Sequence, residues 1–234
     1  MVWPGVYQEE VVFDSRRITL QSADDAAVVE APGNGIAFSF YGAESSNSIL
    51  RNFVITNCGE AAVLCSSASP ELINLTIADN KFGIAAYEGA SPVITNCILW
   101  NNTDGDLFGD MFQPRAYYSC LGTLESGDTD RGNISEDPMF ADPADGDYHL
   151  QSKYGRYSPQ QGWVTDSQTS PCINKGDPGM HRGREADGGR VNMGAYGGTP
   201  YASLSGSTLL SDTEDEDPLL EIQTVQTFEQ DNRE

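Results

Sequence analysis

The 234-residue sequence has few basic residues, few histidines and no long apolar run. Thirteen Lys and Arg stand against 35 Asp and Glu, and the resulting net charge of −22 argues against binding to nucleic acid or to an anionic membrane surface. No run reaches about 18 apolar residues, so we predict no membrane span. The opening residues, MVWPGVYQEE, lack the basic and apolar regions of a signal peptide. Because they begin inside a strand-like pattern, we expect a trimmed N-terminus.

Cysteine and histidine are also scarce, with five cysteines, two histidines, no CxxC pattern and no Cys/His cluster. A zinc site needs closely spaced ligands, so we predict none. Five cysteines cannot all pair with one another, and we expect most of them to be small buried thiols, although the sequence leaves their disulfide state open. They are Cys58, Cys65, Cys97, Cys120 and Cys172.

Glycine and proline are plentiful, with 24 and 12 residues, while only 38% of the chain is hydrophobic, which favours an all-β chain with many turns. A repeat supports this class: Asn52, Asn74 and Asn96 are spaced by 22 residues, and Ser69-Pro70 recurs at Ser91-Pro92. Within each unit the apolar residues alternate with a period of two, as in strands. Three short strands per 22 residues predict a right-handed parallel β-helix, in which the coils stack about 4.8 Å apart.

The asparagine column predicts a tight bend in every coil, because asparagine tolerates the left-handed backbone and its amide can bond to its copy in the next coil. We predict six to eight coils within residues 1–205, with regular coils over about 35–102. The segment 103–118 is predicted to be an insertion that breaks the period, and 118–205 to form irregular coils. Residues 206–234 are acid-rich and are predicted to be a disordered tail.

Three segments resemble the pectin-lyase-like right-handed β-helix superfamily, and more narrowly the secreted β-helix repeat proteins of planctomycetes and other environmental bacteria. They are SPVITNCILWNN, DPMFADPADGDYHLQS and SPCINKGDPGMHRGREADGGRVNMGAYGGTP. The resemblance covers roughly residues 3–205 and implies a secreted or cell-surface location and a polysaccharide partner. It implies no single activity, because the superfamily includes lyases, glycoside hydrolases and adhesins.

Three functions therefore remain open. The first is a carbohydrate-associated extracellular domain that binds a polysaccharide or serves as a scaffold on it. The second is a polysaccharide lyase or a glycoside hydrolase. The third is a structural module that self-assembles end to end into a homo-oligomer through uncapped coil ends.

The strand GIAAYE tests whether one outer sheet face holds a lyase site. With Ile84 and Ala86 inward, alternation and the 22-residue columns place their neighbours on the outer face. That face lacks the aspartates that would hold calcium against a uronate, and it lacks a Lys or Arg base, so no pectate-lyase-type site is expected there. The residues placed outward are Ala37, Ser39, Val63, Cys65, Ala85 and Tyr87.

Residues that depart from the repeat are the catalytic candidates. Asp79 and Lys81 lie near one turn and form either a working pair or a polar-column residue beside a solvated lysine. Tyr87 with Lys81 is a second acid/base hypothesis, which needs a sharp turn because six extended residues span up to about 20 Å. Glu60 is a further catalytic candidate and Glu88 a candidate substrate contact, since hydrolysis needs two carboxyls roughly 5–10 Å apart on one surface.

The predicted insertion is the candidate substrate-binding region. Trp100 at its edge offers a stacking platform for a sugar ring, while Asp104, Asp106 and Arg115 offer polar contacts. The alternative is a loop that only covers the side of the coil.

A third candidate region is DPADGDYHL. Its Asp142, Asp145 and Asp147 are spaced loosely like a calcium loop, although the loop lacks the bidentate Glu of such sites. Calcium is therefore the candidate cofactor.

Overall fold

The computed structural model describes residues 1–14, 16–23, 25–42, 47–110, 115–181, 185, 187 and 189–206. In this part of the chain nearly all regular structure is strand, and the helical pieces are three short 3-10 turns. The prediction of an all-β fold is confirmed. The turns are η1 (Pro32–Asn34), η3 (Thr129–Arg131) and η4 (Pro143–Asp145).

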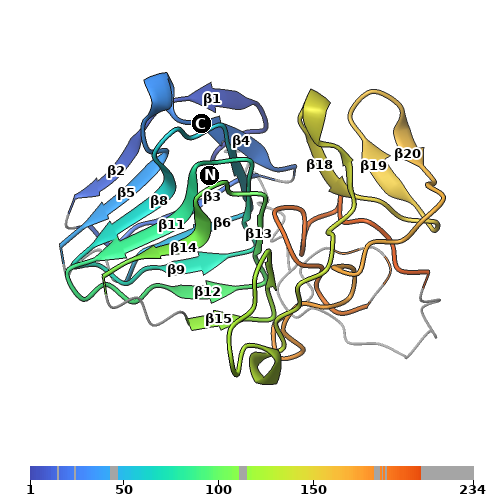
Figure 1. Cartoon of the computed structure of the whole chain (residues 1–234). Helices are drawn as coiled ribbons and strands as arrows, with labels where there is room; N and C mark the ends of the chain where they lie inside the picture. Colours follow the sequence, from blue (N-terminus) through green and yellow to red (C-terminus); the bar gives the residue numbers. More distant parts are fainter. Residues whose placement is uncertain are drawn as a thin grey trace, which may run out of the picture.

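Three parallel sheets wrap around a common core as a right-handed parallel β-helix (Figure 1), the hand that connections between parallel strands of one sheet normally take. Each sheet takes one strand from every coil. Sheet I consists of β1 (Val6–Gln8), β4 (Ala27–Glu30), β7 (Phe53–Thr56), β10 (Thr76–Ala78), β13 (Ile98–Trp100) and β16 (Cys120–Leu121). Sheet II consists of β2 (Val11–Asp14), β5 (Phe38–Tyr41), β8 (Ala61–Ser66), β11 (Phe82–Tyr87) and β14 (Gly105–Gly109). Sheet III consists of β3 (Thr19–Gln21), β6 (Ile49–Arg51), β9 (Glu71–Ile73), β12 (Val93–Thr95) and β15 (Arg115–Tyr117).

The strand order gives five coils of about 22 residues and the first strand, β16, of a sixth. The repeat length is confirmed, whereas the prediction of six to eight coils was too high. The reason is that the chain leaves the coil after β16 and folds against its outside.

Segment 103–118 is not an insertion, because it forms most of the fifth coil. Strand β14 pairs in parallel with β11, and β15 pairs in parallel with β12. Leu107 lies beside Ile84 in this register and packs on the core, and Ala116 is fully buried. The acids and glycines around Leu107 hide this strand in the sequence, since they replace the apolar residues of the other coils.

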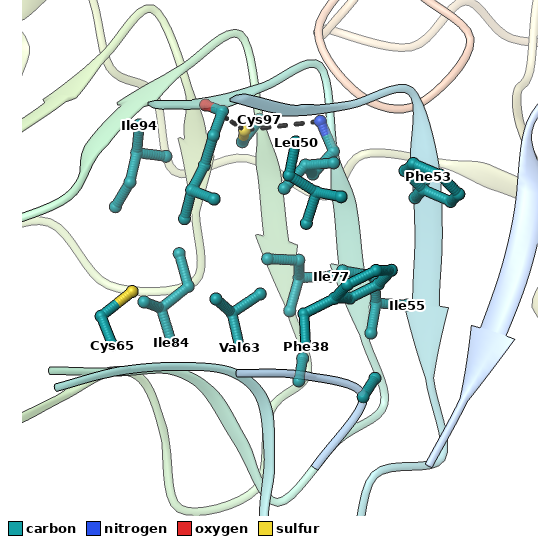
Figure 2. Packing of buried hydrophobic residues seen from close by; sticks show 14 of the residues in the cluster. Phe38, Leu50, Phe53, Ile55, Val63, Cys65, Ile77, Ile84, Ile94 and Cys97 are labelled. Atoms are coloured by element: carbon teal, nitrogen blue, oxygen red, sulfur yellow. Dashed lines mark hydrogen bonds between the residues drawn. The ribbon is translucent and has the colours of Figure 1, made fainter. Parts of the chain in front are cut away.

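The core is a stack of aliphatic and aromatic side chains from all three sheets (Figure 2), with neighbours in one column contributed by successive coils. Phe38, Val63 and Ile84 form one such column in sheet II, and they pair directly in the register of β5, β8 and β11. Each is fully buried, and burial of a side chain of this size contributes roughly 1.5–3 kcal/mol. The repeated apolar columns therefore hold the coils together.

The structure corrects the predicted orientation of three side chains in sheet II. Val63 and Cys65 point into the core beside Ile84 (Figure 2), and Ala37 is buried in the same core. Partners in β8 and β11 are 21 residues apart, not 22, so the 22-residue alignment placed β8 one residue out of register. A shift of one residue turns every side chain of a strand to the other face.

The predicted asparagine bends are confirmed. Asn52, Asn74 and Asn96 have φ of 60°, 47° and 55°, in the left-handed region that asparagine tolerates. The second polar column, Asn57, Asp79 and Asn101, is also left-handed, with φ between 57° and 59°. The backbone of each coil thus turns sharply on both sides of its sheet I strand.

Residues 122–206, the C-terminal lobe, lie beside sheet I (Figure 1). Where irregular coils were predicted for 118–205, the strands after β16 form two antiparallel pairs. These are β17 (Phe140–Asp142) with β18 (Asp147–Leu150) and β19 (Arg156–Ser158) with β20 (Gly162–Val164). Within the described ranges no helix is long and apolar enough to cross a membrane. The predicted tail lies outside the described residues, apart from Gly206, and its disorder stays a prediction.

All five cysteines are free and buried, as the sequence predicted for most of them. Burial raises the pKa of the Cys58 thiol to about 11 and that of Cys97 to about 12, so these thiols are protonated at neutral pH. They serve as small apolar side chains.

Candidate functional site

The lobe covers the outer face of sheet I because that face is apolar. Val54 and Ala78 pack against Tyr148 and Tyr196 of the lobe, and Ile98 packs in a second cluster with Met193. Sheet I is therefore buried on both faces, unlike sheet II, whose outer face carries exposed Val12 and Phe108. A strand such as FVIT, with four buried residues in succession, shows the nearly continuous apolar pattern expected for this situation.

The asparagine column joins the coil to the lobe. The Asn52 amide donates to the carbonyls of Ala195 and Gly197 at 2.8 and 3.0 Å, and the Asn74 amide donates to those of Asn192 and Gly194 at 3.0 and 3.1 Å. A buried carbonyl left without a donor costs about 1–3 kcal/mol. These bonds fix where the lobe sits on the coil.

A groove of about 450 Å³ opens where the lobe meets the second polar column, and we call it the lobe groove. The coil contributes residues that follow β10 or lie at the end of β13, and the lobe contributes the segment before and within β17 together with two glutamines. The lining residues are Asp79, Trp100, Asn101, Asp137, Met139, Phe140, Pro143, Gln151 and Gln168.

Asp79 is held in place from two directions. Its Oδ1 accepts a hydrogen bond from the Asn101 amide in the next coil, and its Oδ2 accepts one from the Tyr148 hydroxyl of the lobe at 2.9 Å. Burial raises the pKa of Tyr148 to about 12, so this hydroxyl keeps its proton as a donor. Both donors favour the ionised form of the carboxyl group.

Trp100 and Phe140 form the apolar part of the groove. Trp100 ends β13 and is half-buried, and both side chains pack against the cluster that contains Ile98 and Met193. The Phe140 ring also meets the Tyr148 ring edge-on, with centroids 5.2 Å apart. The two aromatic side chains are thus fixed by packing before any ligand enters.

The polar wall on the lobe side consists of Asp137, Gln151 and Gln168. One oxygen of Asp137 accepts from the backbone N–H of Met139 at 2.8 Å, and its side chain is exposed. The Gln151 amide nitrogen donates to the Phe140 carbonyl at 3.1 Å, which orients the amide oxygen as the group left for a ligand. Aromatic faces beside carboxylates and amides are the groups that bind sugar rings and their hydroxyls.

Of the residues predicted from the sequence, the structure brings Asp79 and Trp100 together in this groove. Lys81 does not join them. Its ammonium lies 4.0 Å from a carboxylate oxygen of Asp104 and 5.6 Å from the centre of the Phe82 ring. The intervening Asn80 turns inward and is buried, so Asp79 and Lys81 have separate surroundings.

Tyr87 and Glu88 lie at the far end of β11 from Lys81. The Tyr87 ring contacts the Phe108 ring edge-on at 6.3 Å. Glu88 accepts hydrogen bonds from the hydroxyls of Ser66 and Ser67, and these bonds lower its pKa. The structure therefore does not bring Tyr87 and Lys81 together. Glu60 is an exposed side chain in the turn before β8.

Asp106 lies in a different groove, of about 400 Å³, between β14 and residues 121–128. Its two oxygens accept hydrogen bonds from the Asn102 amide and the Gly122 N–H, both at 2.7 Å, and burial raises its pKa. Both oxygens thus hold the start of the lobe against the fifth coil. The side chain of Arg115 lies outside the described residues.

The three aspartates proposed for calcium do not converge. Asp142 accepts from the backbone N–H of Asp145 at the start of η4, whereas Asp147 turns to His149 at 2.7 Å and to Arg156 at 3.2 Å. Among the residues that the structure describes, no three His, Cys, Asp or Glu side chains are grouped to hold a metal ion. The spacing in DPADGDYHL thus serves a turn and a buried ion pair.

The sequence analysis missed the lobe wall of the groove, namely Asp137, Phe140, Gln151 and Gln168. These residues belong to no repeat, so no column singled them out. The one available signal was the block DPMFADPADGDYHLQS, which carries the first three of them and was used only for the resemblance.

The fold and the groove define a parallel β-helix with a lateral lobe, the class of scaffold that presents a surface groove rather than an enclosed active-site cavity. The chain belongs to the disaggregatase-related family, whose model matches residues 35–176, more than half of its length. Comparisons with the curated proteins and with the solved structures gave no match. The family shown is therefore not the pectin-lyase-like superfamily, and the latter assignment stays a prediction.

Proposed function

We propose that this chain is an extracellular carbohydrate-binding domain that holds a segment of a polysaccharide in the lobe groove. The observation that carries the proposal is the groove itself, in which Trp100 and Phe140 lie beside carboxylate and amide groups. The matched family range contains all nine residues that line it. The family name refers to a disaggregatase, and a domain that grips a polymer suits a protein that separates aggregates.

Binding is tested by affinity electrophoresis and titration calorimetry against a broad panel of polysaccharides. Trp100→Ala is expected to weaken binding about tenfold, because a stacked aromatic ring contributes on the order of 1 kcal/mol beyond its buried area. Trp163→Ala is the matched control, since Trp163 is exposed on the lobe but does not line the groove. Equal losses in the two variants, or no binding to any polymer, would refute the proposal.

A glycoside hydrolase is the second candidate, favoured by one observation: two carboxyl groups, Asp79 and Asp137, line the same groove. Hydrolysis with two carboxyls needs one held as the carboxylate and one that donates a proton. Asp79, bonded to Tyr148 and Asn101, fits the first role, and the exposed Asp137 would take the second. A lyase fits less well, because no Lys or Arg is among the lining residues to act as its base.

The same panel separates binding from hydrolysis. Release of reducing ends that disappears in Asp137→Asn would establish the hydrolase, whereas retention of the polymer without new reducing ends would leave a binding domain. An unsaturated product that absorbs in the ultraviolet would instead indicate a lyase.

A further inference from the structure

We propose that the lobe groove selects uncharged sugar residues and rejects polymers of uronic acids. This inference names the substrate class of the proposed carbohydrate site and rests on that proposed function. It follows from the charges and from the balance of hydrogen-bond donors and acceptors in the groove.

Every ionisable group that lines the groove is a carboxyl group. Asp79 and Asp137 are these groups, and the lining residues include no Lys, Arg or His. The cations with described partners are occupied elsewhere: Lys81 lies at Asp104, and Arg156 lies at Asp147 and Asp166. A uronate entering the groove would therefore meet two like charges and no compensating one.

The hydrogen-bonding groups lead to the same conclusion. The amide nitrogens of Asn101 and Gln151 already donate, to Asp79 and to the Phe140 carbonyl. What they leave toward the groove are amide oxygens, beside the carboxylate oxygens of Asp79 and Asp137. Such a wall accepts hydrogen bonds from sugar hydroxyls, whereas an ionised carboxylate brings acceptors only.

The charge of the whole molecule acts in the same direction. With a net charge of −22, the chain repels a polyanion before contact is made, most strongly at low salt. A groove built for uronates would need basic residues to overcome that repulsion, as sites for anionic polymers generally do.

The test uses pairs of polymers that share a backbone and differ only in charge: polygalacturonan and its methyl ester, and hyaluronan and its methyl ester. Each is titrated into the full chain at low and at high salt. We expect the ester to bind at least about tenfold more tightly at low salt, the size of effect given by two like charges at close range in water. The difference is expected to shrink at high salt.

Asp137→Asn tests whether the groove itself discriminates. It should shrink the difference between acid and ester, while Glu60→Gln, which removes an exposed charge of the coil, should leave the difference unchanged. Retention of uncharged panel polymers without retention of either uronate polymer would support the same conclusion.

Two failures are distinguishable. Equal or tighter binding of the acid form would overturn the selectivity and leave the proposed carbohydrate site standing. Failure of every polymer of the panel to bind would overturn the proposed function and the selectivity together.

Discussion

The coil and the C-terminal lobe are held by two different kinds of contact. In the coil, each strand pairs with the equivalent strand of the next turn, as in the register of Thr76 with Ile98. In the lobe, the decisive contacts reach across the chain, as in the bonds from Asn74 to residues 118 and 120 positions further on. Local repetition thus builds the coil, whereas the lobe is positioned by the coil's surface. The lobe groove exists only because the two meet.

The largest effect is expected from a charge placed in the coil core. Val63→Asp should prevent folding or cost several kcal/mol, because Val63 is fully buried among aliphatic side chains. Leu64→Asp is the matched control on the neighbouring residue, which is half-buried and next to Ala85 and Ser39 in the outward row. Soluble expression and urea unfolding measure both. A Leu64→Asp variant that is as damaging as Val63→Asp would contradict the register.

The joint between coil and lobe is tested by Asn74→Ala, for which we expect a loss of about 3 kcal/mol. Two lobe carbonyls lose their donor, and alanine is strained at the left-handed φ of this position. Asn57→Ala is the control, since Asn57 has a similar φ but an exposed amide that donates to Glu30. Urea unfolding should show about 2 kcal/mol less loss in the control. Equal losses would mean that the lobe adds nothing through this residue.

The smallest effect concerns a buried acid of the lobe, Glu185. Burial raises its pKa to about 7, because one oxygen accepts from the backbone N–H groups of Asn192 and Gly198 while the other has no partner. Since the folded pKa exceeds the unfolded value of 4.5, this group's stability contribution is complete below pH 4.5 and is lost as the pH rises toward 7. Glu185→Gln should therefore remove about 2 kcal/mol of pH dependence between pH 4.5 and 8. Urea unfolding across that range measures it, and identical slopes for both proteins would refute the assignment.

The coil was predictable because its repeat is written in residue types that have one structural use. The left-handed bends follow from asparagine, and the aliphatic columns follow from alternation. The error at β8 has a physical cause: the turn before β11 is one residue shorter than the turn before β8, and the turn after β11 is one residue longer. The partners in β9 and β12 are again 22 residues apart, so the two changes cancel and the alignment looks continuous.

Half of the lobe groove was visible in the same way. Asp79 and Trp100 stood out because they depart from their columns, and both line the groove. Asp137, Phe140 and Gln151 belong to a segment without repeats, where side-chain positions depend on which surface the segment packs against. The fifth coil was missed for a related reason, since Asp106 and Gly109 occupy strand positions that are apolar in other coils.

By itself the sequence determined the β-helix, its 22-residue coil, its asparagine bends and most of its inward columns. These follow from alternation and turn chemistry, which act over a few residues and recur in every coil. Only the tertiary structure decided that the lobe covers sheet I, that Val63 faces the core, and that Asp79 meets Asp137 and Gln151 across a groove. Those placements depend on the burial of Val54 and Ile98 against residues far along the chain, and no local pattern encodes such a contact.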